Sequence, residues 1–303
     1  MKGVLIFILI VLVGIAGYLG YFVFMNISAN PESFSAIYSK KNLVLVNSSV
    51  EQFYPNMRFK TGEISYSIGT ECDSEKRDRM ITALNYLENK TKVLKFYESS
   101  SGDIEVRCGK EYEKEGLFVA GEGGPNLIIN GTLFNVILSG QILLLYSKPP
   151  CSSEQYNVEL HELLHVLGFA HSPDSRNIMY KISECNQAVS EETITELVEL
   201  YSIESLPDLY FKDVFAVKKG GYLNLNFSIF NQGLEDSSNI RVELETEGKS
   251  EQVYNFTEIG ISEGRLFWVE NMKIPYNTKI ANLTIVNGKE LDYSNNIVTL
   301  TLA

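Results

Sequence analysis

The sequence predicts an apolar N-terminal helix, then an α+β domain, and then an all-β domain. Residues 4–25 carry no charged side chain. Between about residues 63 and 202, runs with strand-like alternation and runs with helix-like periodicity follow one another, which is typical of an α+β fold. From about residue 208, apolar and polar residues alternate in many short runs. Short alternating runs separated by turn residues predict an all-β domain.

The uncharged stretch from Val4 to Met25 is long enough to cross a hydrocarbon core of about 30 Å as a helix. Tyr18, Tyr21 and Phe22 lie near its end, where amphipathic rings favour a membrane interface. A signal peptide is the alternative, although its apolar region is usually shorter and no small-x-small cleavage site follows here. We expect residues 1–25 to be a retained, single-pass anchor.

The composition is that of an ordinary globular protein with a negative charge. Of the 303 residues, 45% are hydrophobic and 21% are charged, and the net charge is −12. This charge argues against a nucleic-acid partner and would repel anionic lipid headgroups. We therefore expect the parts outside the anchor to stand away from the membrane surface.

Four cysteines and seven glycosylation sequons point to an exported protein. Cys72, Cys108, Cys151 and Cys185 allow three pairings. We favour Cys72–Cys108, which would tie the start of a helix to the end of the strand that follows it, and Cys151–Cys185, which would close a loop around the histidines. Four free thiols in a reducing compartment are the alternative. The sequons begin at Asn26, Asn47, Asn89, Asn130, Asn226, Asn255 and Asn282.

The α+β domain is expected to span residues 53–206. Asp73 or Ser74 would start its first helix, because short polar side chains cap the free amides of a first turn. Ser190, followed by two glutamates, would start its last helix in the same way. The expected elements are strands at 64–68, 93–97, 103–107 and within 116–146, and helices at 74–90, 161–167 and 190–202.

All three histidines of the chain lie in one stretch, residues 161–171, which reads HELLHVLGFAH. If this stretch begins as a helix, His161 and His165 lie one turn apart on the same face, as two ligands of one metal must. Gly168 would let the backbone leave the helix in a conformation closed to other residues, which brings His171 toward the same point.

Three neutral imidazoles are typical ligands of a catalytic Zn²⁺ whose fourth position stays open. Glu162 lies about a third of a turn from the ligands, too far round to bind the same ion but close enough to act on a water there. A buried amphipathic helix with incidental histidines is the alternative. We expect one Zn²⁺ at His161, His165 and His171, with Glu162 as the general base.

The pattern HExxHxxGxxH, followed by Met179 eight residues after His171, resembles the metzincin clan of zinc endopeptidases. Ser172, directly after the third histidine, and the eight-residue step to the methionine are similar to the matrixin branch. The resemblance implies a metzincin-like catalytic domain with a twisted mixed sheet and three helices, and a tight turn at Met179 beneath the metal. It also implies an edge strand, between Asn126 and Leu138, that pairs with the substrate backbone.

The sequence departs from the matrixin pattern in two ways. Lys181 stands where a proline usually follows Met-Tyr, and no Pro-Arg-Cys-Gly segment precedes the domain. Tyr180 has the matrixin spacing and is assigned no metal ligation. The additional structural zinc of vertebrate matrixins requires histidines that the chain lacks, whereas Ca²⁺ sites made of carbonyls and carboxylates stay possible.

About seven short strands fit residues 207–303, which is the pattern of an immunoglobulin-like sandwich. The start at residues 207–209 (Pro-Asp-Leu) and the end at residues 292–296 (Asp-Tyr-Ser-Asn-Asn) resemble cell-adhesion-related sandwich modules of archaeal and bacterial surface proteins. Trp268 is the only tryptophan, and we expect it in the core.

Together these features predict a single-pass membrane protein whose catalytic and sandwich domains lie outside the cell. The expected activity is hydrolysis of internal peptide bonds in protein or peptide substrates. The alternative is a surface adhesion or binding protein with a structural or vestigial zinc site, in which the sandwich is the functional part. Residues 26–52, rich in Ser and Asn, would be a stalk or linker, too short for a folded inhibitory pro-domain.

Overall fold

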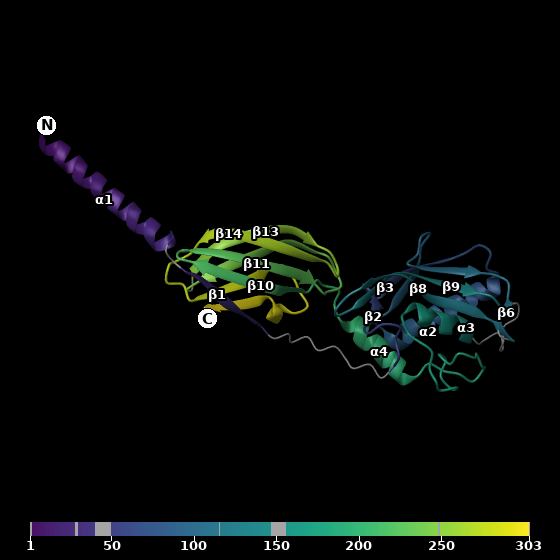
Figure 1. Cartoon of the computed structure of the whole chain (residues 1–303). Coiled ribbons are helices and arrows are strands. Elements are labelled where there is room, and N and C mark those ends of the chain that lie inside the picture. Colours follow the sequence, from purple (N-terminus) through teal and green to yellow (C-terminus); the bar gives the residue numbers. More distant parts are fainter. Residues whose placement is uncertain are drawn as a thin grey trace. The chain divides into compact units, whose positions relative to one another are not determined.

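The structure is a computed structural model, shown in Figure 1. It describes residues 2–27, 30–39, 50–114, 116–146, 156–247 and 249–302. The chain forms two compact units: Met1–Asn42 with Asp208–Asn231 and Asp236–Ala303, and Leu43–Pro207 with Gln232–Glu235. After the domains that the sequence predicts, we call the first the sandwich unit and the second the catalytic unit.

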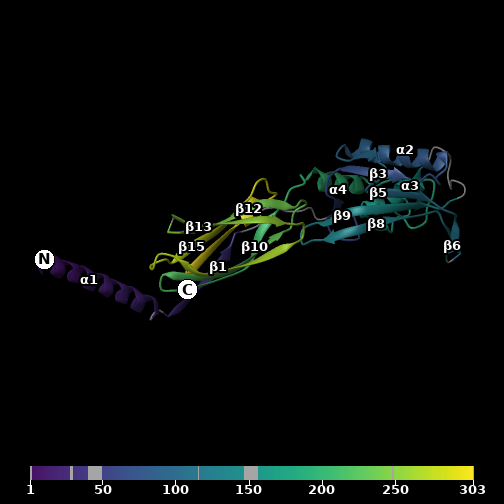
Figure 2. The same ribbon diagram turned by 90° about the horizontal axis from the view of Figure 1, so that it is seen from above.

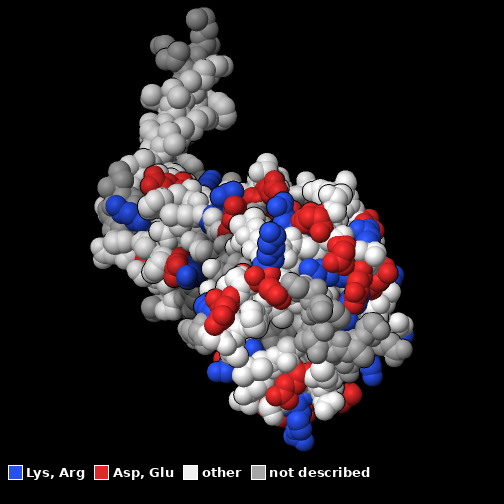
Figure 3. Space-filling view, turned by 90° about the vertical axis from the view of Figure 1, so that its right-hand side faces the viewer, with Lys and Arg blue, Asp and Glu red and all other residues white. Residues whose placement is uncertain are grey.

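The first helix, α1, spans Lys2–Ile27. Its segment Ile6–Phe24 has a mean hydropathy of 2.5 and is 0% buried inside the protein. By length and composition this helix fits either a membrane span or a signal sequence. Figure 3 shows no charged side chain on its described part, whereas acidic and basic side chains are interspersed over the rest of the face in view.

The catalytic unit contains a mixed sheet with the strand order β2-β9-β5-β3-β4, and β8 pairs with β9. The pairs β2–β9, β5–β9, β3–β5 and β3–β4 are parallel, whereas β8 runs antiparallel to β9. The strands are β2 (Met57–Phe59), β3 (Glu63–Ile68), β4 (Lys95–Glu98), β5 (Ile104–Cys108), β8 (Gly121–Asn130) and β9 (Asn135–Leu144), with a separate hairpin of β6 (Tyr112–Lys114) and β7 (Leu117–Val119).

Helices α2 (Ser74–Thr91), α3 (Asn157–Val166) and α4 (Glu191–Ser202) accompany this sheet. Both predicted caps are confirmed: Asp73 accepts a hydrogen bond from the amide of Lys76, and Ser190 accepts one from the amide of Thr193. Figures 1 and 2 both place α2 and α3 on the same face of the sheet. Apolar residues of these helices and of the strands form one buried core, which fixes α3 against the sheet.

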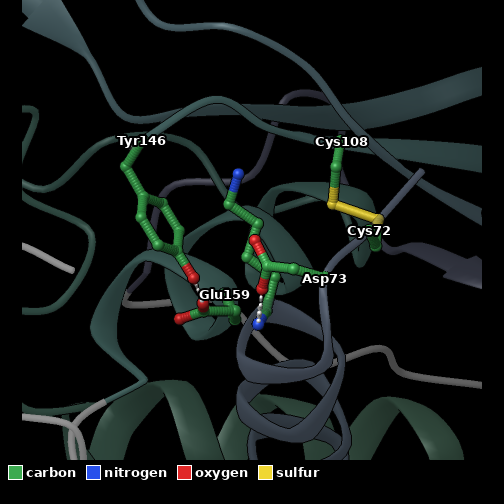
Figure 4. The surroundings of a disulfide bond; sticks show 6 residues. Cys72, Asp73, Cys108, Tyr146 and Glu159 are labelled. Atoms are coloured by element: carbon green, nitrogen blue, oxygen red, sulfur yellow. Dashed lines mark hydrogen bonds between the residues drawn. A yellow bond between two sulfur atoms is a disulfide. The ribbon is translucent and has the colours of Figure 1, made fainter. Parts of the chain in front are cut away.

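The predicted disulfide between Cys72 and Cys108 is present, with a sequence separation of 36 residues. Figure 4 shows it beside Asp73, where it joins the segment before α2 to the end of β5. The second predicted pairing, Cys151–Cys185, includes Cys151, which lies outside the described residues. The first disulfide therefore ties the start of α2 to the central part of the sheet.

The sandwich unit is built from two sheets that share one buried core. The strand order is β13-β12-β15-β16-β1-β10-β11-β14, and every described pair is antiparallel. The strands are β1 (Pro31–Tyr38), β10 (Leu209–Lys219), β11 (Tyr222–Asn231), β12 (Ser237–Thr246), β13 (Lys249–Ile259), β14 (Gly264–Lys273), β15 (Ile280–Val286) and β16 (Ile297–Leu302).

Strand β1 differs from the sequence prediction, which places a stalk at residues 26–52. Its first part pairs with β10 and its second part with β16, so it passes from one sheet of the sandwich to the other. Only Phe34 of β1 is buried, and so little burial leaves too weak an alternation to indicate a strand. The catalytic unit is consequently inserted between β1 and β10.

Trp268 also differs from the prediction, because its side chain is 72% exposed. It lies on β14 between Phe267 and Val269, which both pack against the sandwich core. Since successive side chains of a strand point to opposite faces, Trp268 must face outward.

Candidate metal centre

Helix α3 presents the first half of the histidine motif and ends where the sequence requires it to end. His161, Glu162 and His165 lie within it, and the helix stops at Val166. Gly168 has φ +99°, and a Cβ atom there would lie 2.9 Å from Cγ of Met57. A glycine is therefore needed both for the backbone conformation and for space.

The three histidines converge on one point. The ring nitrogens that they offer lie within 4.8 Å of one another. Nε2 of His165 is 3.0 Å from Nε2 of His161 and 3.2 Å from Nε2 of His171. Nitrogens bound to one tetrahedral Zn²⁺ at about 2.1 Å lie about 3.4 Å apart. The spacing of the three nitrogens is therefore close to that of a zinc site.

Backbone carbonyls fix the orientation of two of the rings. Nδ1 of His161 is 2.6 Å from the carbonyl oxygen of Ile178, and Nδ1 of His165 is 2.8 Å from that of Phe169. A carbonyl oxygen only accepts, so each Nδ1 carries the proton and donates it. The facing Nε2 atoms then both present lone pairs, which a shared cation would satisfy.

Burial keeps these imidazoles in the form that binds metals. It lowers the pKa of His161, and it lowers the pKa of His165 to about 4, with a further contribution from His161. Burial also lowers the pKa of His171. Neutral imidazole is the metal-binding form. The donor set therefore fits a divalent ion of the zinc type.

Glu162 lies in the same cleft and is only 6% exposed. Burial, followed by the negative charges of Glu122 and Glu159, raises the pKa of its carboxyl group to about 8. Among the described residues no hydrogen bond to this carboxylate is found. The Glu162 carboxyl group therefore lies next to the convergent histidines without a hydrogen-bond donor from the described part of the protein.

Two glycines of β8 allow the edge of the sheet to pass close to Glu162. A Cβ atom on Gly121 would lie 2.8 Å from Oε1 of Glu162, and one on Gly123 would lie 2.4 Å from the Glu162 carbonyl oxygen. In the described part of the chain β8 pairs only with β9, so its other edge is open. The sequence places the edge strand that would pair with a substrate between Asn126 and Leu138. Strand β8 starts earlier, at Gly121.

The cleft has a volume of about 860 Å³. The hairpin β6–β7 and the segment after Met179 contribute to its walls, and Phe118 of the hairpin is 73% exposed. The lining residues outside the metal motif include Leu117, Phe118, Val119, Gly121, Gly123, Lys181 and Ile182. The walls therefore combine apolar side chains with charged ones, since Glu111, Lys114 and Glu122 also line the cleft.

Met179 lies in the core, with 1% exposure, and does not line the cleft. Its amide donates to Oδ1 of Asn177, and its carbonyl oxygen accepts from the amide of Ser172. The preceding Ile178 supplies the carbonyl that holds His161. This turn therefore orients one histidine through the backbone.

Sequence reasoning missed Phe53, whose ring stacks on His165. The ring centroids are 5.7 Å apart and the planes are inclined by 22°. The amide of Phe53 donates to the carbonyl of Gly168, and the amide of Ala170 donates to that of Glu51. The end of the predicted stalk is thus paired with the histidine motif. No local pattern at residues 50–53 signals a pairing over such a sequence distance.

A buried ion pair connects α3 to α2. Glu159, with 0% exposure, accepts hydrogen bonds from the Tyr146 hydroxyl at 2.5 Å and from Nε of Arg79 at 3.3 Å. Figure 4 shows the contact between Tyr146 and Glu159. Burial and the charge of Glu159 raise the pKa of the Tyr146 hydroxyl. The pair links α2 to α3, one turn before Glu162.

The histidines are the one group of three or more His, Cys, Asp or Glu residues that the described part of the chain places to hold a metal ion. Neither this arrangement nor the comparisons below support the Ca²⁺ site that the sequence leaves possible. One metal ion is therefore the expectation that the fold supports.

The family whose model matches residues 58–202 is described as Matrixin. The match supports a matrixin-like metalloprotease. The family is zinc-dependent, and the matched residues contain the three histidines, Glu162 and Met179. No curated protein matches the chain.

Two solved structures are similar to about a third of the chain. A domain of a protein assigned as a cell surface protein of Methanosarcina acetivorans is 18% identical, covers 32% of this chain and 92% of its own, and has a TM-score of 0.26. The CARDB domain of a Pyrococcus furiosus protein, in complex with di-metal ions, is 14% identical, with coverages of 32% and 88% and a TM-score of 0.26. TM-scores this low assign neither fold nor function.

Proposed function

We propose that this protein is a membrane-anchored zinc endopeptidase. The observation that carries the proposal is the convergence of His161, His165 and His171 beside the buried Glu162, in one cleft of a segment that matches the matrixins. The domain formed by residues 53–206 would hydrolyse internal peptide bonds of protein or peptide substrates.

The chemistry follows from the chain's own groups. A zinc ion held by the three histidines would polarise the scissile carbonyl and lower the pKa of a water. Glu162 accepts the proton of the attacking water and passes it to the leaving amine. Its side chain can do both because no described residue donates a hydrogen bond to it. The turn at Met179 and the ring of Phe53 hold the ligands in place.

Strand β8 would bind the substrate backbone. Its open edge runs along the cleft at Gly121 and Gly123. An extended peptide that pairs with this edge gains main-chain hydrogen bonds whatever its sequence, while wall residues such as Phe118 select among side chains. Lys181, in the place of a proline in the matrixin pattern, also lines the cleft.

Helix α1 would be the anchor and the folded units would lie outside the cell. Its length and its apolar composition support a membrane span. The Cys72–Cys108 disulfide supports an oxidising compartment. We also infer that the sandwich is immunoglobulin-like, because its described strands are antiparallel in two sheets.

The test is cleavage of a peptide library by the purified full-length protein, with products identified by mass spectrometry. We expect cuts within peptides, loss of cutting with a chelator and recovery with Zn²⁺, together with about one zinc ion per chain. A protein that holds one zinc ion and cuts no peptide would contradict the proposal and would favour the alternative of a surface binding protein.

A further inference from the structure

The two ends of the sandwich differ in charge. At the end where β1 begins, Pro31 lies opposite Lys219, and the exposed side chains of Lys273 and Lys279 lie at the ends of the adjoining strands β14 and β15. At the opposite end the loops carry Asp236, Glu263, Glu290 and Asp292, together with Lys289. In a chain with a net charge of −12, lysines are therefore gathered at the end that adjoins α1 in sequence.

Two acidic residues, Glu32 and Glu247, lie beside these lysines. Glu32 lies 3.6 Å from Nζ of the buried Lys218, which also donates to the Thr278 carbonyl at 3.1 Å. Glu247 accepts a hydrogen bond from the amide of Lys279. Lys218 is matched by Glu32, so Lys219, Lys273 and Lys279 are the exposed cations of this end, and Glu247 is the carboxylate beside Lys279.

Aromatic and apolar side chains accompany the lysines. Tyr276 is 51% exposed and Ile280 is 50% exposed. A recess of about 370 Å³ lies between Glu32, Lys218, Tyr276 and Lys279. Exposed lysines next to a tyrosine and an aliphatic side chain are the composition of a membrane interface, where rings and cations meet headgroups.

The covalent connection keeps this end close to any membrane that α1 crosses. Helix α1 ends at Ile27 and β1 begins at Pro31. Four residue steps span at most about 14 Å. The headgroup layer on each side of a bilayer is about 5–7 Å thick, and the electrostatic screening length is about 8 Å at physiological salt. The lysines are therefore within reach of the headgroups.

We propose that this end of the sandwich docks on the anionic headgroups of the membrane. We call it the basic end and define it by Lys219, Lys273, Tyr276, Lys279 and Ile280. The inference rests on the proposed anchoring by α1, and it goes beyond that by giving the sandwich a lipid-binding surface. It also reverses locally the repulsion that the net charge of the whole chain predicts. Each lysine near an anionic surface shifts the docking equilibrium about fivefold.

The experiment uses the full chain in nanodiscs of phosphatidylcholine alone or of phosphatidylcholine mixed with phosphatidylglycerol. Hydrogen exchange of residues 219–222 and 273–280 is measured in both. We expect slower exchange in the anionic discs. The triple variant Lys219→Gln, Lys273→Gln, Lys279→Gln should lower the ratio of docked to undocked protein about a hundredfold, since three fivefold factors multiply, and should exchange alike in both lipids.

A matched control removes three cations from other parts of the sandwich: Lys212→Gln, Arg241→Gln and Arg265→Gln. It should keep the slow exchange in anionic discs. Equal exchange of the unaltered protein in the two lipids, or equal loss of protection in the control variant, would overturn the docking surface.

Intact mass shows separately whether α1 is retained. A chain without α1 overturns anchoring and docking together, whereas a retained α1 without slower exchange in anionic discs overturns docking alone. Peptide cleavage is unaffected in each case.

Discussion

The cleft beside the histidines and the end of the sandwich opposite the basic end each bury a glutamate, and burial raises the pKa of both. The pKa of Glu162 is raised to about 8 and that of Glu290 to about 7. Their surroundings differ. Oε2 of Glu290 accepts hydrogen bonds from the amide of Leu209 at 3.3 Å and from the Asn296 side chain at 2.9 Å. Glu162 has no such donor among the described residues and borders a cleft of about 860 Å³.

The difference shows that a raised pKa alone does not identify a functional carboxylate. At Glu290 the backbone and an asparagine already use the carboxylate, so the group joins β10 to the turn before β16. At Glu162 no described residue donates a hydrogen bond to the carboxylate, which lines the same cleft as the three histidines. What distinguishes the two is therefore the absence of protein donors and the access to a substrate-sized space.

The largest expected effect separates these two glutamates. Glu162→Gln should lower kcat for peptide cleavage about 10²–10⁴-fold, because a general base is lost, and should leave zinc content unchanged. Glu290→Gln should leave kcat and zinc content as they are. Cleavage rates and atomic absorption on the two variants measure this. Undiminished cleavage by Glu162→Gln would refute its role.

The next effect concerns Glu159, the carboxylate of α3 that does have donors. Arg79→Met should destabilise the catalytic unit by about 3–5 kcal/mol, because it leaves Glu159 buried without its cation. Calorimetry should show the loss in one unfolding transition only. Arg107→Met, which removes an exposed pair with Glu105, is the control and should leave the transition unchanged. An equal loss from both variants would mean that the buried pair has no special role.

The third prediction is a pH dependence of the sandwich. The folded pKa of Glu290 is about 7, above its ordinary value of 4.5. The folded state therefore holds this proton more tightly than the unfolded state, so the stability that Glu290 contributes is fully present below about pH 4.5 and is lost as pH rises through 7. The fall attributable to Glu290 should be about 3 kcal/mol.

Glu290→Gln should remove this part of the pH dependence, because the amide does not titrate. Unfolding of the sandwich by denaturant at several pH values measures the slope. If the variant kept the pH dependence of stability of the unaltered protein, Glu290 would not be its cause. The Glu290 carboxylate would then be ionised in the folded state at neutral pH, and its pKa would not be raised as that of Glu162 is.

The smallest expected effect tests Phe53. Phe53→Ala should weaken metal binding about tenfold, because the ring that packs on His165 is lost and second-layer contacts have this magnitude. Phe53→Tyr should restore most of the affinity. Competition with a chelating dye measures it without any activity. Phe118→Ala, which removes an aromatic ring from the cleft wall that has no described contact to the histidines, should leave metal affinity unchanged; a tenfold loss there would mean that the effect is not specific to Phe53.

The sequence predicts features that are local. The convergence of the histidines follows from helix periodicity and one glycine within residues 161–171, and the caps Asp73 and Ser190 follow from the residues beside them. Seven described strands after residue 208 agree with the alternation there. In each case the residues that decide the structure are neighbours in the chain.

The features that escaped prediction depend on distant partners. Phe53 reaches His165 only through pairing with Gly168–Ala170, and β1 is a strand only because β10 and β16 flank it. Trp268 lies in an unbroken apolar run, Leu266 to Val269, in which alternation cannot tell the inner face from the outer one. Tertiary pairing decides such positions.

The split between β1 and its partners sets an order of assembly. Ser39, just after β1, bonds to Ile297, which lies 258 residues later. At a synthesis rate of about 5–20 residues per second, β1 waits tens of seconds for β16. Residues 43–207, which form all of the catalytic unit except Gln232–Glu235, are contiguous and can fold during that time. A prematurely terminated chain would thus carry a nearly complete catalytic unit but an unpaired strand β1 after α1, exposed to pairing with other chains.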